Sequence, residues 1–419
     1  MRLVSLIVAA GICWAGISME EYRARRAALQ KAIPEAVVVV AGSTERERGD
    51  LRSPFFQEPN FLYLTGWREP GAILVVAPGV QALFLPDHNE TRERYTGKKA
   101  RPGDANIASV TGFAKVYALG ELPAKLGEWA AGRKIGVLGQ GAMLEEVRKA
   151  LAEKKIEADE SVGVGLELAR LRMVKSAAEV ELIQKSVHAT LEAHKAAWNR
   201  ASAGIYEYQV ASAMGGVYFE RGCERHAYPP IVASGPNAVI LHYMANKRRM
   251  DKGELLLMDV GAECSDYTAD ITRTIPVSGK FTPRQREIYE IVLAAQKAAI
   301  AAARPGMKFM GTGEDSLNGI ALSHLRKHGL EKYYLHTLGH HVGLEVHDAN
   351  VPDAPLEPGM VITIEPGIYI AEEGIGVRIE DMVLITENGA KVLSEKLPRE
   401  AEAMERAVSS RNPQKKRVN

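Results

Sequence analysis

The chain has 419 residues, which exceeds the size of one ordinary hydrophobic core and predicts two domains. Its 46% hydrophobic and 25% charged residues are typical of a globular protein. The 53 Lys and Arg residues nearly cancel the 52 Asp and Glu residues, so we expect neither nucleic acid nor an acidic membrane as a partner. Only three cysteines occur, at Cys13, Cys223 and Cys264, which argues against a disulfide framework and favours free, buried thiols.

The first segment, MRLVSLIVAAGICWAGIS, predicts a signal peptide over residues 1–18. One arginine precedes about fifteen mostly apolar residues, a run too short to span a bilayer but suited to the apolar part of a signal peptide. Gly16 and Ser18 offer small residues at a cleavage site before Met19. Met19 also begins MEEYRARRAALQ, which resembles a natural cytoplasmic start. We expect export to the periplasm or out of the cell, and a cytoplasmic location if the first segment is not a signal peptide.

Residues 19–160 predict an α/β domain. The runs EAVVVVAG, AILVVAPG, VQALFLP and KIGVLGQ are short, apolar and bounded by Gly or Pro, which is typical of buried strands. The segment GAMLEEVRKALAEKK predicts a helix. Helices and strands that alternate in this way indicate an α/β fold for the first domain.

Residues 176–400 predict a second domain, which begins with a sharp helix start. Ser176 and Glu179 form a capping box before a long helical pattern, and a second helix is expected over residues 206–221. The strand-like runs ELLLMDVGA and YTADITRTIPV follow these helices. The first half of the domain therefore reads as two helices and then strands.

The same element order recurs in the second half. TPRQ at residues 282–285 is another capping box with proline at the first helical position, and a further helix is expected over residues 315–327. The runs MVITIEPGIYI and GVRIEDMVLIT then predict strands. This order indicates a duplicated α+β domain over residues 176–390, although the two halves share almost no sequence. The polar, basic tail SSRNPQKKRVN is expected to be disordered.

Acidic residues lie inside apolar strands in both halves. Asp259 follows LLLM, and Asp270 lies on the next strand, so pairing of the two strands can bring both carboxylates together. Asp259 alone could equally be an acid bonded to backbone amides at a strand end. In the second half, Glu365 lies in a strand, while Glu380 and Asp381 point to opposite faces, so only one of them can join a common site. Alternation does not choose between these two.

A histidine cluster accompanies the acids of the second half. Residues 333–349 contain four of the eleven histidines without an HExxH motif, and the pattern leaves open which of them binds a metal. Buried like charges repel unless a cation lies between them. Four carboxylates and one imidazole would suit two divalent ions. The oxygen-rich donor set favours Mn²⁺, with Zn²⁺ or Co²⁺ as alternatives.

Several motifs carry a family resemblance. MDVGAECSDYTADITRT, HTLGHHVGLEVHD, TIEPGIYI and GVRIEDMVLIT resemble, in order and spacing, the metallopeptidases of the pita-bread fold, and more narrowly Xaa-Pro aminopeptidase and prolidase. SPFFQEPNFLYLTGWREPGAILVV is similar to the N-terminal domain of the same group. The resemblance implies an α/β aminopeptidase P-like N-terminal domain followed by a pita-bread catalytic domain, which is a duplicated ααβ unit.

The resemblance also implies site residues. One metal would be held by Asp259 and the other by His340 and Glu365, while Asp270 and Glu380 would bridge both ions. The resemblance thus selects Glu380 over Asp381. Three further histidines and an arginine match substrate-binding positions, namely His242, His336, His347 and Arg378. His341 is left with a structural or exposed position.

These assignments suggest a hydrolytic mechanism. Two cations lower the pKa of a bridging water and polarise the scissile carbonyl. Glu365 is a candidate proton shuttle, and His347 and His242 can donate to the carbonyl oxygen as charge develops on it. Each of these two histidines, taken alone, is about as often a satisfied core side chain.

The leading hypothesis is an Xaa-Pro aminopeptidase, which removes the first residue of a peptide when proline is second. Prolidase, which takes only Xaa-Pro dipeptides, would share all five ligands. A non-catalytic peptide-binding module is a remote alternative, because such a module would be expected to have lost ligands. We see no inserted loop in residues 176–390 that could clamp a dipeptide carboxylate, which favours the aminopeptidase. The resemblance also implies a homodimer or homotetramer.

Overall fold

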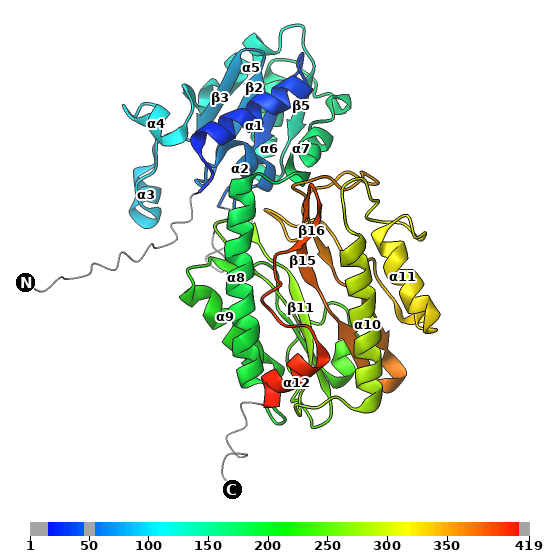
Figure 1. Cartoon of the computed structure of the whole chain (residues 1–419). Helices are drawn as coiled ribbons and strands as arrows, with labels where there is room; N and C mark the ends of the chain where they lie inside the picture. Colours follow the sequence, from blue (N-terminus) through cyan, green and yellow to red (C-terminus); the bar gives the residue numbers. More distant parts are fainter. Residues whose placement is uncertain (1–15, 46–54, 410–419) are drawn as a thin grey trace, which may run out of the picture.

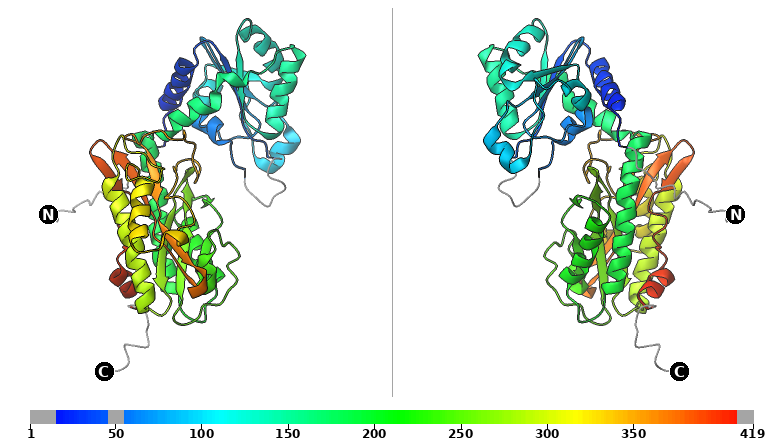
Figure 2. Two further views of the ribbon diagram at one scale, coloured as in Figure 1. Left: turned by 90° about the vertical axis from the view of Figure 1, so that its right-hand side faces the viewer. Right: turned by 90° about the vertical axis from the view of Figure 1, so that its left-hand side faces the viewer.

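The computed structural model describes residues 16–45 and 55–409. Most of the predicted signal peptide and the polar tail beyond Ser409 lie outside these residues. Two parts follow one another along the chain (Figure 1), and they meet near the start of α8 (Ala177–Arg200) (Figure 2). Within the described ranges, no helix is long and apolar enough to cross a membrane.

The N-terminal part is a five-stranded sheet with helices on both faces. Its elements are α1 (Met19–Ala32), β1 (Val37–Ala41), α2 (Pro59–Thr65), β2 (Ile73–Ala77), β3 (Val80–Leu85), α3 (Glu90–Thr96), α4 (Ile107–Thr111), β4 (Lys115–Ala118), α5 (Leu122–Trp129), β5 (Ile135–Leu138), α6 (Gly141–Glu153) and α7 (Val164–Met173). The strand order is β4-β3-β2-β1-β5, with β1 antiparallel to β2 and parallel to β5. The predicted α/β organisation is therefore confirmed.

The central strand β1 shows why these segments read as continuous apolar runs. Val37 and Val39 pack into one core with α5 and α6, while Val38 and Val40 pack into another with α1, α2 and α7. A strand that is covered on both faces has no polar side to show in its sequence.

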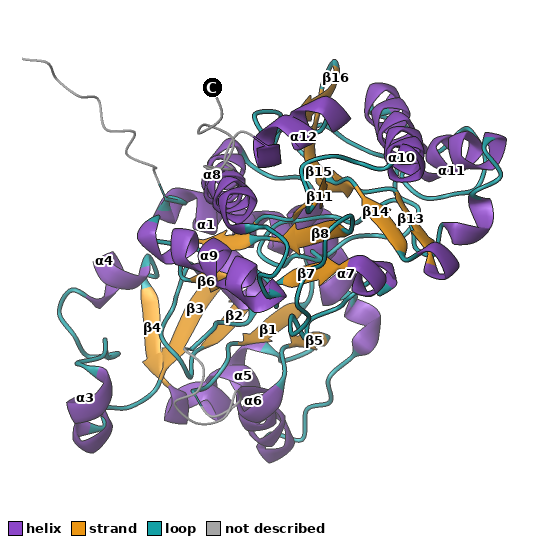
Figure 3. Cartoon of the chain, turned by 90° about the horizontal axis from the view of Figure 1, so that it is seen from below, coloured by secondary structure: helices purple, strands orange, loops and turns teal. Residues whose placement is uncertain are grey.

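The C-terminal part repeats two helices and a set of strands. Its first half holds α8, α9 (Glu207–Glu220), β6 (Arg225–His226), β7 (Ile231–Ser234), β8 (Leu255–Val260), β9 (Ala262–Cys264), β10 (Tyr267–Thr268) and β11 (Ile271–Pro276). Its second half holds α10 (Pro283–Ala302), α11 (Leu317–Lys327), β12 (Val361–Ile364), β13 (Gly367–Ile370), β14 (Ile375–Arg378), β15 (Asp381–Thr386), β16 (Gly389–Val392) and α12 (Ala401–Ser409). Figure 3 shows β11 and β15 between the helices of the two halves. The predicted duplication is confirmed.

Both predicted capping boxes are present where the long helices begin. The Ser176 hydroxyl accepts a hydrogen bond from the Glu179 amide at 3.2 Å, and the Glu179 carboxylate accepts one from the Ser176 amide at 3.0 Å. Thr282 and Gln285 make the same reciprocal pair at the start of α10. These local hydrogen bonds satisfy amides that the helix itself leaves unpaired.

The cysteines differ from the sequence expectation. Cys223 and Cys264 form a disulfide, so the prediction of free thiols is wrong for this pair. Cys223 follows α9 and Cys264 ends β9, and the backbone hydrogen bond from Glu224 N to Glu263 O joins the two segments. The pairing of β6 with β9 therefore brings together two cysteines that lie 41 residues apart in the sequence.

The connections within residues 176–390 are not all short, which corrects a second expectation. Residues 334–360 run from the last turn after α11 to β12 without forming a helix or a strand. This segment carries the histidine cluster. Connection length therefore no longer argues for one peptidase type over the other.

Candidate metal centre

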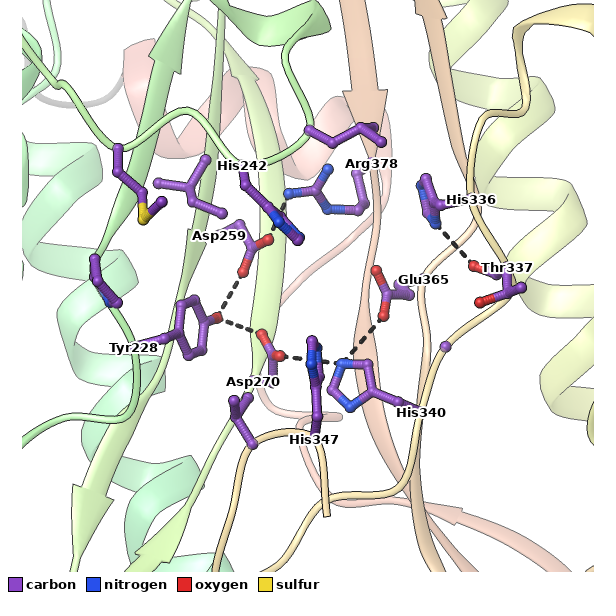
Figure 4. A pocket seen from close by; sticks show the side chains of 16 residues that line it. Tyr228, His242, Asp259, Asp270, His336, Thr337, His340, His347, Glu365 and Arg378 are labelled. Atoms are coloured by element: carbon purple, nitrogen blue, oxygen red, sulfur yellow. Dashed lines mark hydrogen bonds and ion pairs between the residues drawn. The ribbon is translucent and has the colours of Figure 1, made fainter. Parts of the chain in front are cut away.

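A cavity of about 400 Å³ opens between the strands of the two halves. Figure 4 shows acidic, imidazole and guanidinium side chains that point into it from both halves. All but one of the site residues predicted from the sequence line it, namely His242, Asp259, Asp270, His336, His340, His347, Glu365 and Arg378. The exception is Glu380, which is buried and lies beside two of them.

The first half supplies two carboxylates that lie close together. Asp259 lies in β8 opposite Thr272 of β11, and Asp270 directly precedes β11. The Tyr228 hydroxyl lies 2.5 Å from Asp259 Oδ1 and also contacts Asp270. On its other side, Asp259 is paired with the Arg378 guanidinium. Strand pairing thus brings the two acids together, as the sequence pattern allowed.

The second half supplies an imidazole and two more carboxylates. His340 Nε2 lies 3.4 Å from Asp270 Oδ2 and 3.4 Å from Glu365 Oε1. Glu380 Oε2 accepts a hydrogen bond from Thr272 Oγ1 at 2.7 Å, while its Oε1 atom is buried without a partner. Potential ligand atoms of Asp270, His340 and Glu380 all lie within 4.8 Å of one another.

Burial and neighbouring charges raise the pKa of three of these four carboxylates and lower that of the fourth. Burial and the charges of Asp259 and Glu365 raise the pKa of Asp270 well above its usual value. Burial, together with Asp270 and Glu365, does the same to the pKa of Glu380. Burial also raises the pKa of Glu365, although His340 and Arg378 oppose the rise. In Asp259 the effect of burial is outweighed by Arg378 and Tyr228, which lower its pKa.

This donor set fits divalent metal ions. Like charges this close take up protons unless a cation lies among them, and the unpartnered Glu380 Oε1 is an oxygen available to such a cation. Carboxylate oxygens with one imidazole match the ligands of divalent metals that are harder than those bound by thiolates. The arrangement is therefore chemically suited to hold metal ions and to activate water next to them.

The structure separates the two neighbouring acids that alternation left open. Glu380 lies beside Asp270 and His340, whereas Asp381 is fully buried away from them in the core of the domain. There Asp381 pairs with Arg273 and Arg399 at 2.7 Å each. The carboxylate of Asp381 is neutralised within the protein and has no part in the cavity.

The other histidines of the cluster take different positions. His336 Nε2 lies 2.8 Å from the Tyr369 hydroxyl, and the His347 ring meets the His340 ring edge-on at 4.2 Å between centroids. His341 is buried and packs edge-on against a phenylalanine ring, Phe309. Of its two expected positions, structural or exposed, His341 occupies the structural one.

Sequence reasoning missed two tyrosines of the site. Tyr228 bridges Asp259 and Asp270, and no local pattern marked it, because it lies in an irregular segment before two prolines. Tyr369 contacts His336 and also accepts from Arg378 Nη1 at 2.7 Å. The even spacing of Tyr369 from Glu365 along one strand-like run was a usable signal for this second residue.

Comparison with known proteins gives consistent matches. The profile of metallopeptidase family M24 matches residues 181–387, and that of the aminopeptidase P N-terminal domain matches residues 22–138. The chain is 33% identical to the Xaa-Pro aminopeptidase of Haemophilus influenzae, over 94% of this chain and 98% of that protein. It is 44% identical to the Xaa-Pro dipeptidase of Pyrococcus furiosus, over 54% of this chain and 64% of the relative.

A solved structure agrees over both domains. Escherichia coli aminopeptidase P with the inhibitor Pro-Leu superposes with a TM-score of 0.84 at 30% identity, over 95% of this chain and 99% of that chain. The C-terminal duplication is therefore the pita-bread fold that the motifs implied. With both domains matched in order, the chain belongs to the aminopeptidase P family of M24 metallo-exopeptidases.

Proposed function

We propose that this protein is an Xaa-Pro aminopeptidase, which hydrolyses the bond between the first residue of a peptide and a following proline. The observation that carries the proposal is the cavity itself. Carboxylates from both halves converge there on His340, in a chain that matches Xaa-Pro aminopeptidases over nearly its whole length.

Two divalent ions, preferably Mn²⁺, are the proposed cofactor. Asp259 would hold one ion, His340 and Glu365 the other, and Asp270 and Glu380 would bridge them. The oxygen-rich donors favour Mn²⁺, with Zn²⁺ and Co²⁺ as alternatives. Bound ions of this kind supply an activated water and polarise a carbonyl group. Metal analysis of the purified protein, followed by reconstitution of chelated protein with each ion, tests the identity.

The chain's own groups handle the proton and the developing charge. Glu365 is the proposed proton shuttle, because a carboxylate that reaches the activated water can take a proton from it and return it. Thr363 Oγ1 donates to Glu365 Oε1 at 3.0 Å and so orients the carboxylate. His347 and His242, both exposed at the cavity, are the proposed donors to the carbonyl oxygen.

The proposed binding site for proline is the part of the cavity lined by His336 and Arg378. Proline lacks an N–H and has a fixed φ, so a peptidase that accepts it requires a shaped pocket after the scissile bond. Tyr369 holds both His336 and Arg378 by its hydroxyl, and Arg378 is buried against Asp259. These contacts fix the two side chains before substrate arrives.

Prolidase activity is the second candidate, because 54% of the chain aligns with a Xaa-Pro dipeptidase at 44% identity. The discriminating measurement is the ratio of kcat/KM for an Xaa-Pro-Yaa tripeptide to that for the matching Xaa-Pro dipeptide. We expect cleavage of the tripeptide and none of the dipeptide. Efficient cleavage of the dipeptide alone would replace the first proposal with the second.

Export of the protein is also proposed, with a mature chain that begins near Met19. The apolar first segment supports it, and so does the disulfide between Cys223 and Cys264, because disulfides persist in oxidising compartments. Mass spectrometry of the native N-terminus after cell fractionation tests this. An intact Met1 in the cytosol, with both thiols reduced, would refute it.

A homodimer or homotetramer is the proposed assembly. The family resemblance supports it, and Tyr208 and Phe219, both on α9, are aromatic side chains that are 51% and 63% exposed. Light scattering coupled to gel filtration would measure the mass in solution, and a monomer at micromolar concentration would refute the proposal.

A further inference from the structure

A buried charge cluster lies at the joint between the two domains. The Asp348 carboxylate accepts hydrogen bonds from Arg172 Nη2 at 2.5 Å and from Lys175 Nζ at 3.0 Å. Arg172 lies in the last turn of α7, and Lys175 lies just before α8, so both cations belong to the segment that joins the domains. All three residues are 5% exposed or less. We call these residues the linker cluster.

The linker cluster reaches both domains. Arg172 Nη1 donates to Asn60 Oδ1 of α2 at 2.7 Å, and Arg172 Nη2 also lies 2.8 Å from Glu345 Oε2. Burial acts to raise the pKa of Asp348, but Lys175 and Arg172 outweigh it and lower the pKa below its usual value. Asp348 is therefore a paired carboxylate, in contrast to Asp270 and Glu380 of the metal centre.

The linker cluster holds the segment 345–348, which forms one wall of the cavity. Val346 and His347 line the cavity, and the anchored residues Glu345 and Asp348 flank them. The segment belongs to no helix or strand. In the part of the chain that the structure describes, the His347 ring contacts the His340 ring and makes no hydrogen bond. Its place therefore depends on the backbone of the segment, which the linker cluster fixes.

We propose that Arg172, Lys175 and Asp348 are positioning residues, which act on catalysis by holding His347 at the cavity. The inference rests on the proposed function, in which His347 donates to the substrate carbonyl as charge develops. A donor that is displaced by about 1 Å can cost about 100-fold in rate. The cluster should therefore affect kcat through His347, in addition to any contribution it makes to stability.

The test is a double-mutant cycle of Asp348→Asn with His347→Ala in the full-length, metal-loaded protein. We expect Asp348→Asn alone to lower kcat on an Xaa-Pro-Yaa peptide by about 10- to 100-fold, with unchanged metal content and a smaller change in KM. In the His347→Ala background the same change should lower kcat by less than about threefold, because the two residues act as one unit. Equal losses in both backgrounds would overturn the inference.

A second pair of variants keeps the test decisive if Asp348→Asn does not fold. Arg172→Gln takes its place in the cycle, and Arg172→Lys, which retains the charge, should recover part of the lost kcat. Equal kcat in these two variants would also contradict the inference.

The matched control is Arg25→Met. Arg25 is 6% exposed and pairs with Glu179 across the same two domains at 3.1 Å, but it does not line the cavity. Its substitution should lower stability, leave kcat within about twofold of wild type and be additive with His347→Ala. If the wild-type protein is inactive on all Xaa-Pro peptides, the proposed function itself is refuted. If it is active but the effects of Asp348→Asn and His347→Ala are additive, only the positioning role is refuted.

Discussion

Two sets of buried carboxylates in the catalytic domain differ in what neutralises them. Asp381 pairs with Arg273 and Arg399 and accepts a hydrogen bond from Ser394 Oγ at 2.6 Å. These partners outweigh the effect of burial and lower the pKa of Asp381. Asp348 in the linker cluster is paired in the same way. Both acids find their positive charge within the chain.

In the metal centre, Asp259 also pairs with a cation, Arg378, but Asp270 and Glu380 lack enough positive charge around them. The pKa values of Asp270 and Glu380 are raised by burial and by their acidic neighbours, and Glu380 Oε1 is buried without a partner. Burial is common to both sets, so burial alone does not mark a ligand. The difference is whether the chain supplies the countercharge, and this difference can be tested by substitution.

The largest expected effect is the loss of metal and activity in Asp270→Asn. The substitution removes one negative charge and a proposed bridging ligand at nearly constant size. We expect the bound-metal content to fall and kcat/KM to decrease by more than about 100-fold. Loss of a residue that only hydrogen-bonds to a metal ligand already costs up to roughly 100-fold. Elemental analysis and steady-state kinetics measure both. The control is Asp266→Asn, a substitution in the surface ion pair with Arg68. Wild-type metal content and kcat/KM in Asp270→Asn would show that Asp270 is not a metal ligand.

Substitution of His340 should lower metal content and rate much more than substitution of its neighbour His341. His340→Ala removes an imidazole that lies 3.4 Å from two of the acids, so metal content and rate should both fall by at least about tenfold. His341→Ala removes packing against Phe309 and should lower stability while leaving metal content near that of wild type. Metal analysis of the two variants side by side would decide, and the reverse ranking would contradict the assignment of His340.

For stability the ranking of the two sets should be reversed. Asp381→Asn leaves Arg273 and Arg399 without their countercharge and should destabilise the fold by about 3–5 kcal/mol. In metal-free protein, Asp270→Asn should cost little or even stabilise, because it removes one of several crowded carboxylates. Urea unfolding in the presence of a chelator measures both. A larger loss for Asp270→Asn than for Asp381→Asn would contradict the comparison.

Much of the fold could be predicted because its signals are local. A capping box such as Ser176 with Glu179 lies within one turn and specifies its own hydrogen bonds. The run at Val37–Ala41 indicates a strand that is buried on both faces, whatever its neighbours are. Acids inside apolar strands were also visible, since an unpaired buried charge is costly wherever it lies.

The features that could not be predicted depend on contacts between distant segments. The choice of Glu380 over Asp381 required the family resemblance, because alternation says only that they face opposite ways. Tyr228 reaches the acids from an irregular segment, and the Cys223–Cys264 disulfide follows from the pairing of β6 with β9. Neither leaves a pattern in its own neighbourhood of the sequence.

The smallest expected effect concerns His194, a buried group that has no countercharge of its own. Its Nε2 atom lies 3.0 Å from the Ile271 carbonyl oxygen, which fits a neutral ring that donates from Nε2. Burial, aided by the charge of Arg273, lowers the pKa of His194 to about 3 from the usual 6.5. Between these two pH values the unfolded chain binds the proton and the folded chain does not. The free energy of unfolding should therefore fall as pH falls through this window.

Replacement of His194 by glutamine should remove this dependence while retaining a donor for the Ile271 carbonyl. We expect the slope of unfolding free energy against pH between about 6 and 4 to decrease by roughly 1.4 kcal/mol per pH unit. Urea unfolding across that range measures the slope. His328→Gln, at an exposed position at the end of α11, should leave the slope nearly as it is in wild type. An unchanged slope in His194→Gln would mean that the buried ring takes up a proton in the folded protein, and that burial without a partner does not keep it neutral.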